Sequence, residues 1–158
     1  MSTSVEYLLK AAGEGDADAQ NQLAGLYKLG DGVKQSNAKA LKWWIKAAEQ
    51  DHAMAQYNLG ECYYYGLGFS NDEWLSIDKA KAAELFLKSA ENGYADAQMS
   101  IGICFYNAIG VAKDKDKAFQ WWMKAAGQGQ ALAVHKLESV HKDEFERWKK
   151  KKGIASDK

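Results

Sequence analysis

The sequence predicts an all-α protein in which antiparallel helix pairs stack one after another. Three observations lead to this fold class: a unit of similar sequence repeats along the chain, apolar residues recur at helical spacing inside each unit, and glycines separate the helices. The 158 residues contain no proline, so glycine is the main signal for helix ends. A chain of this length buries enough surface to form a core without a disulfide or a metal.

An N-terminal helix is predicted over residues 4–15. Its apolar residues have helical spacing, and it ends in Lys10-Ala11-Ala12, a motif that returns at the ends of later helices. The segment therefore resembles the second helix of a pair, and we expect it to cap the stack.

The first helix of each pair is predicted from an Ala-Gln start. Ala19-Gln20 returns as Ala55-Gln56 and then as Ala97-Gln98, at offsets of 36 and 42 residues. In each copy a Leu or Ile lies four residues after the alanine, and an aromatic residue lies four residues further on. This spacing puts the apolar residues on one face of a helix. A degenerate fourth copy begins at Ala133.

The second helix of each pair is predicted over 40–48, 82–90 and 118–126. The first and third of these segments contain adjacent tryptophans and end in Lys-Ala-Ala. We expect most of these tryptophans to pack in the core. Glycines such as Gly32 and Gly110 lie between paired helices, where a chain that reverses direction commonly needs a positive φ.

These residues resemble the Sel1-like repeat family, which is related to the tetratricopeptide solenoids. The family pattern joins the Ala-Gln start to a Leu-Gly, an aromatic residue, a Gly-x-Gly-Val turn and a final Lys-Ala-Ala. The chain departs from it at Ala24, where the family has glycine, at Leu85, where it has tryptophan, and at Asn107-Ala108, where a glycine turn should open. The resemblance implies a right-handed α-solenoid of stacked antiparallel helix pairs, with the first helices lining a concave face.

We expect a single repeat domain over residues 1–158. Its predicted parts are an N-terminal capping helix at 4–15, repeats at 16–51, 52–93 and 94–129, a C-terminal capping helix at 130–152, and a disordered tail at 153–158. The second repeat is six residues longer than the others, and its added loop contains Trp74 and Leu75. These two side chains either contact a partner or cover the core, and the sequence leaves both possibilities open.

No motif in the sequence supports catalysis, a metal site or a cofactor, so we expect a protein that is not an enzyme. Cys62 and Cys104 occupy equivalent positions in adjacent repeats, beside core aromatic residues, and are predicted to be buried free thiols. The histidines, His52, His135 and His141, lack the spacing of metal ligands. Free thiols fit a reducing compartment, and we expect a cytoplasmic protein.

The charge balance argues against a dedicated nucleic-acid or anionic-membrane binder. The 21 Lys and Arg residues equal the 21 Asp and Glu residues, and no window is long and apolar enough to predict membrane insertion. The basic run over 147–152 is the exception. It predicts either a solvated capping helix or, alternatively, an accessory site for nucleic acid or a membrane surface.

A binding surface is predicted on the side of the first helices that faces away from the stack. This stripe carries aromatic and apolar residues in the middle repeats, whereas a solvated helix face is ordinarily charged. The candidate contact residues are Lys28, Met54, Tyr57, Glu61, Tyr64, Met99, Ile103, Tyr106 and His135. The alternative interpretation is that these side chains fill space between stacked first helices.

The predicted function is a non-enzymatic protein–protein interaction module that binds a peptide or a protein element in the concave groove. The resemblance implies an adaptor or scaffold and, alternatively, an immunity or inhibitor protein that sequesters a toxin or an enzyme. We expect a protein or peptide partner and no nucleic acid, and a monomer or weak dimer.

Overall fold

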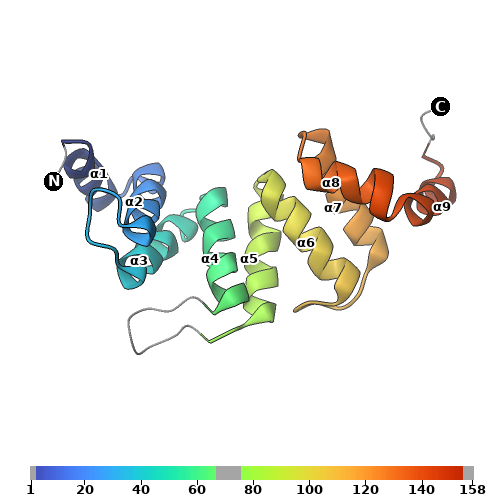
Figure 1. Ribbon diagram of the computed structural model, residues 1–158, viewed down its shortest axis with the longest axis horizontal. Coiled ribbons are helices and arrows are strands. Elements are labelled where there is room, and N and C mark those ends of the chain that lie inside the picture. The colour runs from blue at the N-terminus through green and yellow to red at the C-terminus, as the bar shows by residue number, and fades with distance from the viewer. Residues whose placement is uncertain (1–2, 67–75, 155–158) are drawn as a thin grey trace.

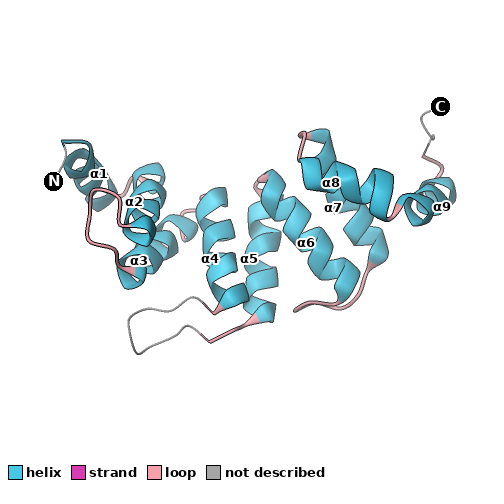
Figure 2. Ribbon diagram, viewed as in Figure 1, coloured by secondary structure: helices cyan, strands magenta, loops and turns pink. Residues whose placement is uncertain are grey.

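The computed structural model describes residues 3–66 and 76–154, and this part of the chain is helical and contains no strand (Figures 1 and 2). The helices are α1 (Thr3–Gly13), α2 (Ala17–Leu29), α3 (Asn37–Ala48), α4 (Ala53–Tyr65), α5 (Lys79–Glu91), α6 (Ala95–Asn107), α7 (Lys115–Gly127), α8 (Ala131–His135), a π-helical turn (Lys136–Val140) and α9 (Lys142–Lys152). The predicted all-α solenoid is therefore confirmed.

The helices pack as consecutive pairs along one long axis. α2 packs against α3, α4 against α5, and α6 against α7, and the pairs follow one another from the N-terminus to the C-terminus (Figure 1). α1 packs against α2, as the second helix of a preceding pair would. We call the surface formed by α2, α4, α6 and α8 the first-helix face.

Side chains cap the helices at the positions where the sequence changes from loop to helix. The Asp16 carboxylate accepts a hydrogen bond from the Ala19 N–H at 2.8 Å, and Asp78 and Asp114 cap α5 and α7 in the same way. A carboxylate at this position satisfies an N–H group that has no partner within the helix. The acidic residues before these helices thus have a structural role.

The departure from the glycine turn after α6 leaves the turn geometry unchanged. α2 and α4 end at Gly30 and Gly66, with φ of 75° and 70°. Ala108 takes the same left-handed conformation after α6, with φ of 59°, and its N–H bonds to the carbonyl of Cys104. The surrounding fold therefore imposes on an alanine the backbone that glycine adopts readily.

The chain over 130–152 forms two helices joined by a π-helical turn, and the single capping helix that we expected is not formed. His141 has φ of −120° and ψ of 21°, outside the helical range, and the chain bends there. The bend places Phe145 and Trp148 of α9 within 5.7 Å of the Phe119 ring, measured between centroids. Burial of these two rings against α7 explains why the helix breaks.

Both cysteines are buried free thiols, as the sequence predicts. Burial raises the pKa of Cys62 and that of Cys104 to about 11, so both stay protonated at neutral pH. In the described ranges, no helix is long and apolar enough to cross a membrane, and no cluster of side chains is suited to hold a metal ion. Residues 155–158 of the predicted tail lie outside the described part of the chain.

Candidate functional site

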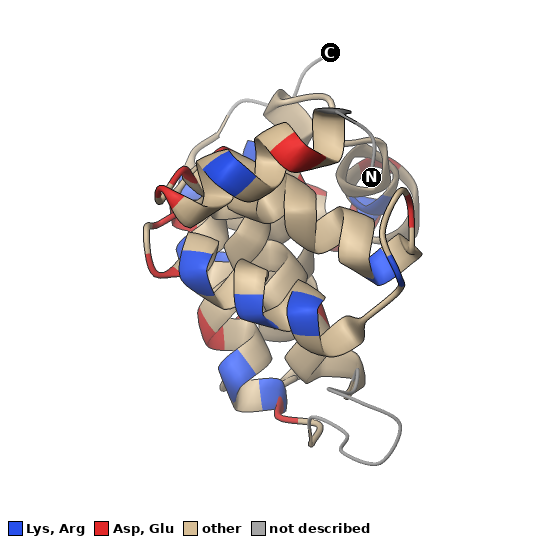
Figure 3. Ribbon diagram, turned by 90° about the vertical axis from the view of Figure 1, so that its left-hand side faces the viewer, with Lys and Arg blue, Asp and Glu red and all other residues tan. Residues whose placement is uncertain are grey.

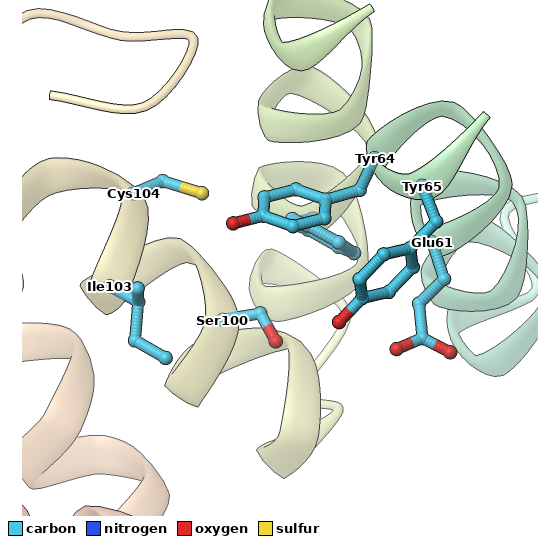
Figure 4. A pocket seen from close by; sticks show the side chains of 7 residues that line it. Glu61, Tyr64, Tyr65, Ser100, Ile103 and Cys104 are labelled. Carbon is cyan, nitrogen blue, oxygen red and sulfur yellow. The ribbon is translucent and has the colours of Figure 1, made fainter. Parts of the chain in front are cut away.

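A hollow of about 100 Å³ opens on the first-helix face between α4 and α6 (Figure 4). The hollow lies between the first helices of two successive pairs, beside α5, which is the second helix of the earlier pair. Its lining residues are Glu61, Tyr64 and Tyr65 from α4, Phe86 from α5, and Ser100, Ile103 and Cys104 from α6. Three of the predicted contact residues, Glu61, Tyr64 and Ile103, meet here.

Tyr57 positions the Glu61 carboxylate one helical turn away. Its hydroxyl donates a hydrogen bond to Glu61 Oε1 at 3.1 Å, and its ring packs against Phe86 and Tyr94, with centroid distances of 5.5 and 5.2 Å. Burial and the Glu61 charge raise the pKa of Tyr57 well above its usual value. The hydroxyl therefore remains a donor to Glu61 at every physiological pH.

Tyr64 and Tyr65 form the aromatic side of the hollow. Their ring centroids lie 4.9 Å apart, and Tyr64 also packs against Phe86 at 6.1 Å. The Lys79 ammonium lies 3.3 Å from the Tyr64 ring centroid and bonds to the Tyr64 carbonyl. Tyr65 is 61% exposed. It is therefore the ring that a partner can reach most easily.

The prediction that Met99 is an exposed contact residue is wrong. Met99 is 3% exposed and packs in a cluster with Trp122 of α7 and with Ala133 and Leu137, which follow in the next repeat. α8, the first helix of that next repeat, covers the outward-facing side of α6 at Met99. Met99 is thus a core residue. This agrees with the alternative interpretation, in which side chains of the stripe fill space between stacked first helices.

The other predicted contact residues lie away from the hollow. Met54 is 43% exposed at the start of α4, where its sulfur accepts a hydrogen bond from Asn21 at 3.4 Å. Lys28 is exposed on α2 with its ammonium 5.5 Å from the centroid of the Trp44 ring, and His135 is exposed on α8. Trp74 and Leu75 lie outside the described residues.

Three lining residues, Phe86, Ser100 and Cys104, are not among the predicted contact residues. Phe86 belongs to a second helix, and Ser100 and Cys104 flank the stripe that we considered. No signal within one helix indicates such residues, because they meet only when three helices are packed together. Tyr65 does have a signal, since it extends the run of adjacent tyrosines at the end of α4.

Tyr106 belongs to a polar cluster at the C-terminal end. Its hydroxyl donates a hydrogen bond to Glu144 Oε2 at 2.5 Å, and the Lys115 ammonium also bonds to Glu144. The His141 ring lies 4.4 Å from the Tyr106 ring and is stacked on Trp122 at 5.4 Å, measured between centroids. The cluster therefore holds the bend at His141 against the third repeat.

We expect acid to weaken this C-terminal cluster. Burial, with Lys136 next, lowers the pKa of His141, and hydrogen bonds from Lys115 and Tyr106 lower that of Glu144. A group whose pKa is lower in the folded state than in the unfolded state contributes stability at pH values above its unfolded-state pKa. This contribution is lost as the pH falls. Stability should therefore decrease below about pH 6.5, first through His141 and then through Glu144.

Urea unfolding of the wild type and of His141→Phe between neutral and mildly acidic pH checks this expectation. Phenylalanine keeps a planar ring on Trp122 but does not titrate. The variant should thus lose less stability on acidification than the wild type. Identical losses in both proteins would contradict the role of His141, because His52 and His135 are unchanged in the variant.

The basic run at the C-terminus is partly neutralised within the protein. Lys149 pairs with Glu146 at 2.6 Å, and Lys152 pairs with Asp116 of α7 at 2.7 Å. At the opposite, N-terminal end, Lys and Arg also lie on several helices with Asp and Glu among them (Figure 3). Carboxylates of the protein therefore compensate part of the charge of the basic run.

A family model described as "Sel1 repeat" matches residues 17–52, 53–94 and 95–130. Among solved structures, the chain is similar to a Sel1 repeat protein from Oxalobacter formigenes, with 33% identity, a TM-score of 0.78, and coverage of 87% of this chain and 98% of that one. None of the curated proteins compared with the chain matches it.

Two further solved structures are similar. The protective antigen c5321 of uropathogenic Escherichia coli, which displays an SLR fold, is 28% identical over 94% of this chain, with a TM-score of 0.78. The chain spans only 33% of that protein. Cysteine rich protein B of Helicobacter pylori is 24% identical over 84% of this chain and 96% of its own, with a TM-score of 0.63, and supports the fold alone.

Proposed function

The chain belongs to the Sel1 repeat family, and on that premise we propose that its first-helix face binds a peptide segment of a partner protein. Proteins of this family are generally protein-interaction scaffolds, and the fold is typically non-catalytic. In this proposal the chain acts as an adaptor, with α1 and α9 as the caps of one repeat domain. Sequestration of a toxin or an enzyme is the second form that such binding can take.

The hollow between α4 and α6 is the observation that supports this proposal. At about 100 Å³ it is smaller than the clefts of a few hundred Å³ that enclose cofactors and drug-sized ligands, and it matches a single side chain. Its walls are aromatic and aliphatic, with a carboxylate at one edge. A pocket of this kind suits an anchor residue of a peptide.

The helices that carry the hollow are already folded, so binding has no ordering cost in the scaffold. Tyr57 and Tyr64 are half-buried and held by ring contacts with Phe86. In the proposal Tyr64 forms part of the wall and Tyr57 supports it through Phe86, while Tyr65 and Ile103 touch the partner. Residues that lie further along the face are proposed to contact the segments that flank the anchor: Lys28, Met54, Tyr106 and His135.

We expect Tyr65→Ala to weaken peptide binding about tenfold or more. The substitution removes a large, accessible ring from the edge of the hollow, and loss of one such anchor commonly costs 1 to 2 kcal/mol or more, roughly a factor of ten. Peptides selected on the wild type from a random phage-displayed library serve as probes. Their affinities are measured by fluorescence anisotropy with the wild type and with the variant.

Tyr7→Ala is the matched control for this experiment. Tyr7 is 72% exposed on α1, far along the chain from the hollow, and its loss should leave affinity unchanged. Thermal unfolding of both variants checks that each remains folded. Equal affinities for Tyr65→Ala and Tyr7→Ala would show that peptides bind elsewhere and would overturn the proposal.

A further inference from the structure

We propose that the hollow between α4 and α6 accepts an arginine or lysine side chain of the partner segment, with Glu61 as its counter-ion. This inference rests on the proposed function and specifies the chemistry of the partner. It follows from the charge of the hollow, from its aromatic wall and from its shape.

The Glu61 carboxylate can bind a cation, and the described part of the protein supplies none. The Tyr57 hydroxyl bonds to one carboxylate oxygen, Oε1. Across residues 3–66 and 76–154, no Lys, Arg or His forms a salt bridge with Glu61, whereas Glu84 and Glu144 each pair with lysines. A half-buried carboxylate without a counter-ion favours a positively charged ligand.

A second carboxylate, Asp96, lies near Tyr94, whose ring centroid is 5.2 Å from that of Tyr57. Asp96, in the first turn of α6, accepts a hydrogen bond from the Gln130 amide at 3.2 Å. Burial, followed by the charges of Asp96 and Glu61, raises the pKa of Tyr94 to about 12. An acidic side chain of a partner would be repelled here, and a basic one attracted.

Lys79 already occupies the Tyr64 ring, so the exposed Tyr65 ring is the aromatic surface that remains for a cation of the partner. The Lys79 ammonium lies 3.3 Å from the Tyr64 ring centroid and 6.0 Å from that of Tyr65, within the range of cation–π attraction. Lys79 is not among the residues that line the hollow. Figure 4 shows the Glu61 carboxylate beside the Tyr65 ring, with Ser100 across from them on α6.

The apolar floor suits the methylene stem of a basic side chain. Phe86, Ile103 and Cys104 line the apolar part of the hollow, and the Glu61 carboxylate lies on its α4 side. A lysine or arginine can place its stem against the apolar residues while its charged group reaches Glu61 and the Tyr65 ring. A purely aliphatic side chain would fill the floor and leave the carboxylate without a partner.

The test combines library selection with a double-mutant cycle. We expect peptides selected on the wild type to share an arginine or lysine. For one such peptide, Glu61→Gln and a peptide substitution of the basic residue by glutamine should each weaken binding about tenfold, and both together should weaken it little further. Glu49→Gln, an exposed glutamate at the end of α3, is the matched control and should leave affinity unchanged.

The outcomes separate this inference from the proposed function. Peptides that require Tyr65 but lack a basic residue, or that bind Glu61→Gln as tightly as the wild type, would overturn the inference alone. A library that yields no peptide dependent on Tyr65 would overturn the proposed function and the inference with it. Thermal unfolding of Glu61→Gln excludes a general loss of structure.

Discussion

Gly110→Ala is expected to lower the free energy of unfolding by about 3 kcal/mol. Gly110 has φ of 68°, and a Cβ atom there would lie 1.9 Å from the carbonyl oxygen of Lys79 at the start of α5. The obstacle is backbone at the start of a helix, so no side-chain rotation relieves it. The measurement is urea-induced unfolding followed by circular dichroism.

Gly32→Ala is the matched control, because Gly32 occupies the equivalent turn of the first repeat. Its φ of 67° is nearly identical, but its Cβ would meet only a methyl group of Val5, at 3.1 Å. This substitution should cost about 1 kcal/mol, the strain of the left-handed backbone. Equal losses for both variants would contradict the close approach of the Gly110 turn to the first residue of α5.

Gly102→Ala is expected to destabilise the protein by about 2 kcal/mol, although alanine is the better helix former. A Cβ atom at Gly102 in α6 would lie 2.3 Å from Nε1 of Trp122. The indole is fully buried and packs against Phe119 and Tyr106, so it cannot move aside. The clash would also disturb the hydrogen bond from Trp122 Nε1 to the Met99 carbonyl, now 3.1 Å long.

For Gly25→Ala, also inside a first helix, we expect a gain in stability where Gly102→Ala gives a loss. Gly25 lies inside α2, and a Cβ atom there would meet nothing within 4 Å. With no clash, the helix propensity of alanine should stabilise the protein by about 1 kcal/mol. Urea unfolding of the two variants side by side gives both values. Stabilisation by Gly102→Ala would contradict the close approach of Trp122 to α6.

The first repeat shows how an alanine at this position is accommodated. Ala24 occupies the place of Gly102, and Trp44 that of Trp122. Trp44 is buried, and within the described part of the chain its Nε1 has no hydrogen-bond partner, whereas Trp122 donates to a carbonyl of α6. The glycine thus allows an indole to reach the neighbouring backbone, and the alanine keeps it away.

The repeat pattern by itself determined the helix pairs, their order and the solenoid. Helical spacing, capping residues and turn glycines are local properties of the chain, and repeats bury their apolar faces against their neighbours in sequence. The same pattern placed Leu23, Leu59 and Ile101 in the core, and the structure buries all three.

The tertiary structure alone decided which residues of the outward stripe remain accessible. Met99 and Ile103 lie one turn apart on α6, yet one is covered by the chain that follows and the other lines the hollow. The hollow itself requires α4, α5 and α6 together, and the bend at His141 depends on the burial of Phe145 and Trp148 against α7. Spacing within a helix shows which residues share a face, but exposure depends on what packs against that face.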